Sequence, residues 1–175
     1  IEDDELDKLA NELLSNFKSD QQSRDEWAKS YVKGLDLLGM KIEERQQPWA
    51  GSSGVFHPVL TESIVRFQAQ AMGEIFPAQG PVRTKTVGKI SREKTEQAKR
   101  VEDEMNYLLT EEMTEYRDET EQMLFKLPLA GSAFKKVYYD PLLERPCAMF
   151  VPAEDFVVSY GASDLMTCER YTHVM

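Results

Sequence analysis

The sequence predicts an α+β fold, in which N-terminal helices, including one long amphipathic helix, are followed by an antiparallel β meander. Apolar residues recur every three or four positions up to about Pro128 and alternate with polar residues after it. Turn-forming segments such as "PAED" and "GASD" separate the alternating stretches. Because the helices come first and the strands afterwards, α+β is favoured over an alternating α/β fold.

Composition sets the broad class of the protein. The chain has 175 residues, of which 41% are hydrophobic and 30% charged, as is ordinary for a globular protein. Its net charge of −10 argues against a broadly basic surface that coats nucleic acid, but leaves room for a local basic patch. Cys147 and Cys168 are too few for a disulfide framework. No apolar run approaches the roughly 20 residues that span a bilayer, so we expect no membrane partner.

Residues 1–45 form an acidic segment with two predicted amphipathic helices. Acidic residues suit the start of the first helix, and Ser19 and Asp20 are the predicted caps of the second. An intramolecular helical hairpin is favoured over an arm that lies on a neighbouring subunit. The apolar stripes consist of Leu6, Leu9, Leu13 and Phe17, and of Trp27, Tyr31, Leu35 and Leu38.

Residues 46–130 are predicted to be a loop followed by a helical region. One helix is expected from Pro58 to Ile75, and residues 82–90 read as a short strand or an extended loop. The longest apolar stripe runs from about Ser91, a good N-cap, to Lys126. Because this exceeds the usual helix length, a break is expected around Thr110 to Thr114, with a continuous coiled-coil seam as the alternative.

Residues 131–175 are predicted to be an antiparallel β region. Its strands are expected within "SAFKKVYYD", "CAMFV", "DFVVSY" and "LMTCERYTHVM". The chain begins with Ile1 and stops at Met175 inside a strand-like pattern, so we expect it to be part of a longer protein.

The stretch "QQPWAGSSGVFHPVL" is the first candidate for a functional loop. It lacks the lysine of a phosphate-binding loop. Ser52, Ser53 and His57 lack the surrounding pattern of a catalytic serine, and the histidines and cysteines lack zinc-ligand spacing. We therefore interpret the loop as scaffolding for a helix start, with Trp49 buried and Trp49→Ala costing ~3 kcal/mol. The anchors are Trp49, Gly51, Gly54, Phe56 and Pro58.

Charged residues supply a second candidate. A basic cluster could contact DNA phosphates, but ion pairing with protein is favoured because no aromatic residues are interleaved with it. Its members are Arg83, Lys85, Lys89, Arg92, Lys94, Lys99 and Arg100. The acidic residues that follow are interpreted as solvated helix faces, namely Glu102, Asp103, Glu104, Glu111, Glu112 and Glu115.

Three blocks of sequence resemble a known family in the same order. They are "PWAGSSGVFHPVLTESIVRFQAQAMGEIFPAQGPVRTKTVGK", "MNYLLTEEMTEYRDETEQMLFKLPLAGSAFKKVYYDP" and "FVPAEDFVVSYGASDLMTCERYTH". The chain resembles bacteriophage portal proteins, the head-to-tail connectors of tailed phages, from about Pro48 to His173. The acidic segment before Pro48 matches less clearly.

The resemblance implies a structural protein without enzymatic activity or cofactor. Portals are rings, typically of twelve subunits, at one capsid vertex, and double-stranded DNA passes through them during packaging and ejection. It further implies partners in the terminase motor, the capsid and the tail or adaptor proteins, and a location in the virion after assembly in the bacterial cytoplasm. The chain would then be a fragment of a larger multi-domain portal subunit, with residues 46–130 in its wing. The alternative is a helical adaptor or scaffolding module that binds a partner helix and forms no ring.

Overall fold

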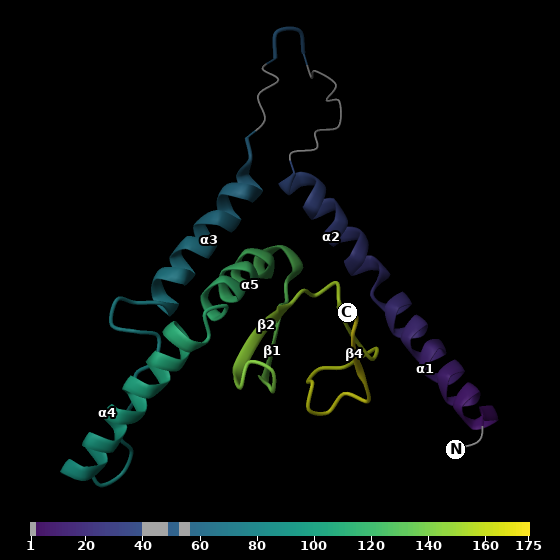
Figure 1. Cartoon of the computed structure of the whole chain (residues 1–175). Coiled ribbons are helices and arrows are strands. Elements are labelled where there is room, and N and C mark those ends of the chain that lie inside the picture. Colours follow the sequence, from purple (N-terminus) through teal and green to yellow (C-terminus); the bar gives the residue numbers. More distant parts are fainter. Residues whose placement is uncertain (1–2, 40–48, 53–56) are drawn as a thin grey trace. The chain divides into compact units, whose positions relative to one another are not determined.

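The computed structural model of the chain describes residues 3–39, 49–52 and 57–175, and it confirms the α+β class (Figure 1). The helices are α1 (Asp3–Ser23), α2 (Asp25–Leu38), α3 (Val59–Ile75), α4 (Arg92–Tyr107), the π-helical turn η1 (Leu108–Glu112) and α5 (Tyr116–Ala130). The strands are β1 (Phe134–Asp140), β2 (Arg145–Val151), β3 (Phe156–Val158) and β4 (Tyr171–His173). None of the described helices is long and apolar enough to cross a bilayer.

Contacts group the chain into two compact units. Unit 1 consists of Ile1–Glu62 together with Val151–Met175, and unit 2 consists of Ser63–Phe150. The three-segment division drawn from the sequence stays a prediction. The structure associates β3 and β4 with the N-terminal helices, which the order of elements along the chain does not reveal.

The predicted antiparallel β region is confirmed, and its strands form two separate two-stranded sheets, with the division between β2 and β3. β1 pairs with β2, and β3 pairs with β4 in antiparallel register, with Val157 opposite Thr172. The physical reason lies at the outer edge of β2. There the backbone N–H groups of Ala148 and Phe150 donate to the carboxylates of Glu115 and Glu119, so these donors are not available to another strand.

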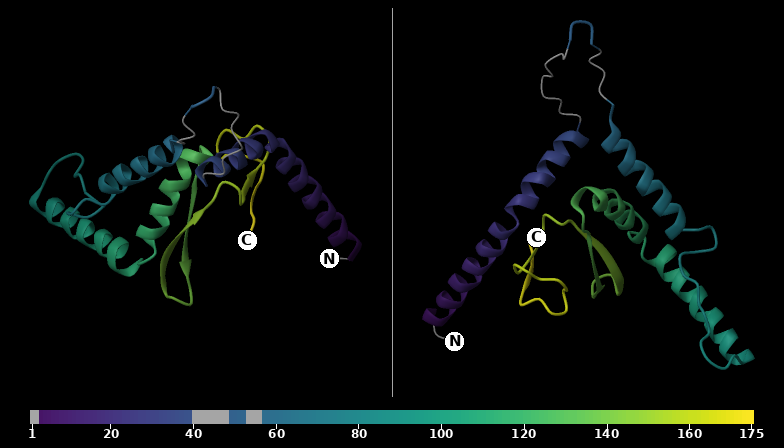
Figure 2. Two further views of the ribbon diagram at one scale, coloured as in Figure 1. Left: turned by 90° about the horizontal axis from the view of Figure 1, so that it is seen from above. Right: turned by 180° about the vertical axis from the view of Figure 1, so that it is seen from behind.

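In unit 1, α1 and α2 follow one another end to end and do not fold back as a helical hairpin (Figure 2). Ser19 and Asp20 do not cap the second helix, because α1 continues to Ser23 and only Arg24 separates the two helices. Asp20 is instead buried, and its two carboxylate oxygens accept hydrogen bonds from Arg170 at 2.6 and 2.8 Å. This bond with Arg170 outweighs the effect of burial and lowers the pKa of Asp20.

Arg24 joins the helix junction to the segment before β3. Its guanidinium donates to the carbonyl oxygens of Ala153 and Phe156, each at 2.9 Å, and to that of Glu154. Its charge also lies 5.0 Å from the centre of the Trp27 ring. One guanidinium thus satisfies three backbone acceptors and holds this segment against the helices.

In unit 2, the long predicted helix is broken near the expected position, and a continuous coiled-coil seam is excluded for this segment. The Ser91 side chain accepts a hydrogen bond from the Lys94 N–H at 3.3 Å, which confirms the predicted N-cap. At the other end, the Met113 N–H donates to the Leu108 carbonyl at 2.8 Å, an i to i−5 bond that closes the π-helical turn. Met113 is 5% exposed, so the break places this side chain in the core.

The end of α5 lies later than the sequence indicates. The helix passes through Pro128 and ends at Ala130, where Gly131 adopts a φ of 79° and donates its N–H to the Leu127 carbonyl at 2.9 Å. A left-handed glycine is a common helix stop. The two-stranded sheet β1–β2 begins directly after it.

Candidate functional site: a basic loop held on helix α4

An extended segment between α3 and α4 runs beside α4 and is held there by two side chains of that helix. Asn106 accepts a hydrogen bond from the Val82 N–H at 2.9 Å and donates to the Val82 carbonyl at 3.1 Å. One turn earlier, Glu102 accepts from the N–H and the hydroxyl of Thr84 at 2.9 and 3.1 Å. Of the two predicted alternatives, strand or extended loop, the structure therefore shows an extended loop.

Two spacings explain why this arrangement fits. Residues four apart on a helix are separated by about 6 Å along the axis, and residues two apart in an extended chain by about 6.6 Å. Glu102 and Asn106 can therefore reach Thr84 and Val82 together without distortion of either segment.

Gly80 is required where the extended segment approaches Asn106. Its φ is +97°, in the region that favours glycine, and its N–H donates to the Pro77 carbonyl at 2.9 Å. A Cβ atom at this position would lie 2.6 Å from both Cγ and Oδ1 of Asn106. A side chain at position 80 would thus displace the amide that holds Val82.

Glu102 remains ionised far below neutral pH. The Thr84 N–H, followed by Lys99 and the Thr84 hydroxyl, lowers the pKa of Glu102 to about 2. Asp103 and Glu102 in turn raise the pKa of Lys99. The interpretation of Glu102 as part of a solvated helix face is therefore wrong, because this carboxylate positions the loop.

Glu115 also departs from that interpretation. Besides the Ala148 N–H, it binds Arg145, whose Nη1 lies 3.0 Å from Oε1 and 2.9 Å from Oε2. Burial acts to raise the pKa of Glu115, but hydrogen bonds from its own backbone N–H, Arg145 and Ala148 outweigh burial and lower the pKa.

The basic cluster divides into bound and unbound side chains. The bound ones use acceptors close by in sequence: Arg83 bonds to Gln79 at 2.6 Å, Arg92 to Glu96 at 2.8 Å, and Lys99 to Glu102 and Asp103 at 3.0 and 2.9 Å. The others are exposed and form no ion pair with any described residue: Lys85, Lys89, Lys94 and Arg100. Ion pairing inside the chain therefore accounts for only part of the cluster.

We use the name basic tip for residues 85–94, the turn before α4 and its first helical residues. Besides the unbound lysines, it presents Val87 and Ile90, which are 83% and 76% exposed. The N-terminal end of α4 adds the positive end of the helix dipole. The basic tip can bind carboxylates or phosphates through its lysines while apolar groups contact Val87 and Ile90.

The loop around Trp49 is less buried than the sequence predicts. Trp49 is 68% exposed, so its prediction as a buried anchor is wrong for the chain by itself. Gly51 has a φ of 86°, as a turn glycine should, and the Ser52 N–H donates to the Trp49 carbonyl at 3.1 Å.

Of the other predicted anchors, Gly54 and Phe56 lie outside the described residues. Pro58 was predicted to be the first helical residue, but α3 begins one position later, at Val59. The Pro58 carbonyl accepts a hydrogen bond from the Glu62 N–H at 3.0 Å, so Pro58 adjoins the helix start.

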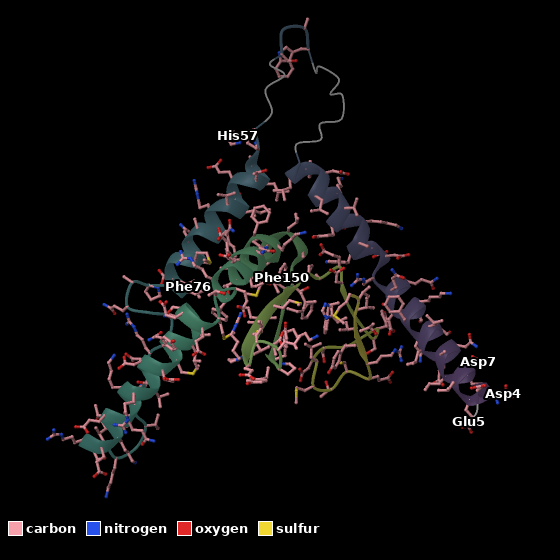
Figure 3. All side chains as sticks on the ribbon, in the orientation of Figure 1. Asp4, Glu5, Asp7, His57, Phe76 and Phe150 are labelled. Carbon is pink, nitrogen blue, oxygen red and sulfur yellow. The ribbon has the colours of Figure 1, made fainter. Side chains whose placement is uncertain are left out.

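The candidate catalytic and metal-binding residues are not assembled into a site within the described part of the chain. His57 is exposed at the start of α3 (Figure 3), and Ser53 lies outside the described residues. No group of three or more histidine, cysteine or acidic side chains there is arranged to hold a metal ion. Cys147 is buried, and burial raises the pKa of its thiol.

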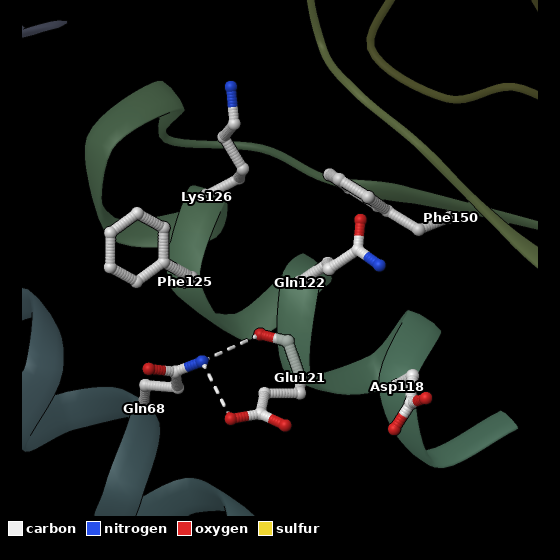
Figure 4. A pocket seen from close by; sticks show the side chains of 7 residues that line it. All are labelled: Gln68, Asp118, Glu121, Gln122, Phe125, Lys126 and Phe150. Carbon is white, nitrogen blue, oxygen red and sulfur yellow. Dashed lines mark hydrogen bonds between the residues drawn. The ribbon is translucent and has the colours of Figure 1, made fainter. Parts of the chain in front are cut away.

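A groove of about 450 Å³ lies in unit 2 between α3, α5 and the end of β2 (Figure 4). Gln68 crosses it and donates to the carbonyl and the carboxylate of Glu121, at 3.1 and 3.4 Å. It is lined by Gln68, Asp118, Glu121, Gln122, Phe125, Lys126 and Phe150. This mixture of amide, acid, lysine and phenyl groups joins the two helices and contains no histidine, cysteine, serine or threonine.

Sequence reasoning missed Asn106, the residue that holds the loop on α4. Its only signal was a polar residue four positions after Glu102 on the same helix face. Comparisons with known proteins add no assignment: no family model matches the chain, and no curated protein matches it.

Proposed function

We propose that the chain is part of a subunit of a bacteriophage portal, a ring at one capsid vertex through which double-stranded DNA is packaged and ejected. The observation that carries the proposal is the order of the three portal-like blocks between Pro48 and His173. Three blocks in one order are more specific than any single motif. On this proposal the terminase motor, the capsid and the tail proteins are partners, and the subunit carries out no reaction of its own.

Exposed apolar surface supports a role in assembly. Leu6, Leu9 and Leu13 of α1 are 46%, 52% and 58% exposed, and Val87 and Ile90 of the basic tip are more exposed still. Apolar groups gathered on one face commonly mark a protein interface. A subunit that functions only within a ring would carry such surfaces.

The charge of the chain agrees with passage of a polyanion. A net charge of −10 opposes the dense phosphate contacts that make DNA binding tight and salt-dependent. We expect the assembled ring to retain little linear double-stranded DNA in a filter-binding assay, even at low salt. Tight retention would contradict this part of the proposal.

Imaging of the full polypeptide tests the proposal as a whole. Negative-stain images should show rings with a central hole, and the mass in solution should correspond to a closed oligomer of about twelve copies, the number typical of the family that the chain resembles. Particles without a hole, at a mass of one or two copies, would contradict the proposal.

The same experiment addresses the adaptor alternative. One observation favours an adaptor, namely the apolar stripe of α1, which could receive a partner helix. The long apolar stripe predicted from about Ser91 to Lys126 would be the other helical surface for a partner helix, but it is broken near Met113, so α1 would have to serve this role. A monodisperse monomer that binds a helical peptide through α1 would support the adaptor over the ring.

A further inference from the structure

The first half of α1 projects from unit 1 with its apolar face uncovered. All side chains from Asp3 to Ser15 are exposed, and Figure 3 shows Asp4, Glu5 and Asp7 at the helix end. At 3.6 residues per turn, Leu6, Leu9 and Leu13 fall within a narrow sector of the helix. A three-turn helix held by no packing is marginal in water, so this one needs a partner surface.

Charge identifies the kind of partner. Glu5 and Glu12 flank the leucine stripe on one side and Asp3 flanks it on the other, whereas Asn11 and Ser15 lie on the opposite face. Two such helices side by side would bring like charges together, which disfavours pairing of α1 with α1. The surface complementary to this stripe is therefore apolar at its centre and positively charged at its rim.

The basic tip offers that surface. Val87 and Ile90 supply exposed apolar groups, and Lys85, Lys89 and Lys94 lie close to them in the chain without an ion pair to any described residue. The first turn of α4 adds the positive end of its dipole.

We propose that α1 of one copy binds the basic tip of a second copy, with the leucine stripe against Val87 and Ile90 and its flanking carboxylates against the lysines. This inference rests on the proposed function, because it names the surfaces that join neighbouring subunits. The two surfaces differ, so the contact is head-to-tail, and a head-to-tail contact repeated from copy to copy closes a ring or extends a filament.

A cross-linking experiment on the full polypeptide tests the contact directly. One tagged population carries Leu9→Cys and a differently tagged one carries Val87→Cys, both with Cys168→Ser so that its thiol does not compete. After mixing under assembly conditions, a short thiol cross-linker should join the two tags. The control pair replaces Leu9→Cys by Asn11→Cys, on the opposite face of α1, and should give much less product.

Charge exchange supplies a second measurement that does not depend on cysteine. Lys85→Glu with Lys89→Glu should weaken self-association by about three- to tenfold, as expected for two exposed ion pairs. Combination with Glu5→Lys and Glu12→Lys in the same chain should restore association. Asn11→Lys with Ser15→Lys, on the opposite face, should not restore it. Circular dichroism of each variant verifies that the helices are retained.

The outcomes separate this inference from the proposed function. Rings without the Leu9–Val87 cross-link would overturn the inference and leave the portal proposal standing. The cross-link in particles that have no central hole would support the inference against the portal proposal. A cross-link found only within one chain would overturn the contact between copies. Binding of the basic tip to anionic vesicles, without the cross-link, would assign the tip to a lipid surface and also overturn the inference.

Discussion

Gly80 is the position where one added methyl group should release the loop from α4. Gly80→Ala places a Cβ atom 2.6 Å from Cγ and Oδ1 of Asn106, and it does so at a φ of +97°. The left-handed backbone alone costs an alanine about 1–2 kcal/mol. Displacement of the Asn106 amide also removes two hydrogen bonds to Val82, each contributing about 1 kcal/mol. We therefore expect Gly80→Ala to lower the free energy of unfolding by about 3–4 kcal/mol.

Gly88 provides a matched control for the backbone contribution. It has a φ of +86°, but a Cβ atom there would have nothing within 4 Å. Gly88→Ala should therefore cost only about 1–2 kcal/mol. Urea denaturation of the two variants gives the difference, and hydrogen exchange at the Val82 amide reports whether its bond to Asn106 is lost.

The decisive comparison is made in an Asn106→Ala background. There the obstructing amide is absent, so the cost of Gly80→Ala should fall to that of Gly88→Ala. If Gly80→Ala and Gly88→Ala cost the same in the original chain, or if removal of Asn106 leaves the cost of Gly80→Ala unchanged, the contact between positions 80 and 106 does not hold the loop.

Three further predictions concern side chains whose roles the structure defines. The pKa of Glu102 is about 2 in the folded chain, against an ordinary value of 4.5. Ionised Glu102 therefore stabilises the fold fully above pH 4.5, and this stabilisation is lost as the pH falls toward 2. The difference in thermal midpoint between the original chain and Glu102→Gln should shrink over this range. Asp20→Asn removes the charged acceptor of two Arg170 bonds and should lower the free energy of unfolding by about 1–3 kcal/mol in urea denaturation, whereas an unchanged midpoint would show that the pair is not stabilising. Trp49→Ala should change the free energy of unfolding of the unassembled chain by less than about 0.5 kcal/mol, because the indole is 68% exposed. A decrease near the ~3 kcal/mol expected from the sequence would show that Trp49 is a buried anchor after all.

Local signals in the sequence predicted the elements well. Ser91 caps α4 because a serine side chain can bond to the N–H three residues later, which depends on nothing distant in the chain. The break near Met113 followed from a stripe too long for one helix. The cap is decided within one helical turn and the break follows from the length of a single stripe, so neither prediction requires a partner distant in the chain.

Features that depend on distant partners escaped prediction. Asp20 is a good N-cap by type, yet it binds Arg170, 150 residues away, and the helix continues past it. Trp49 was expected to be buried because indoles usually are, but burial requires a surface to pack on. Sequence periodicity indicates which face of a helix is apolar and leaves open what covers it.

Carboxylates and amides of the helices take the place of missing strands in unit 2. On α4, Glu102 and Asn106 bond to the backbone of Thr84 and Val82. At the start of α5, the N-cap residue Glu115 and the helix residue Glu119 bond to the backbone of Ala148 and Phe150. In both cases two side chains four residues apart bond to two backbone positions two residues apart. The extended segment runs antiparallel to the helix at α4 and parallel to it at α5. The match of the two spacings is therefore sufficient for this contact, whichever way the segment runs.

An unpaired strand edge attracts other strands, and the helix carboxylates remove that attraction from β2. Association of this chain should therefore use side-chain surfaces such as α1 and the basic tip and should leave the edge of β2 as it is. The Phe150 amide should then exchange equally slowly in the monomer and in the assembly, as measured by hydrogen exchange. Glu119→Ala, which frees that N–H, should accelerate its exchange and increase aggregation, and Asp118→Ala, at an exposed acidic residue of the same helix, serves as the control. Protection of the Phe150 amide that appears only on assembly would instead show that subunits join through this strand edge.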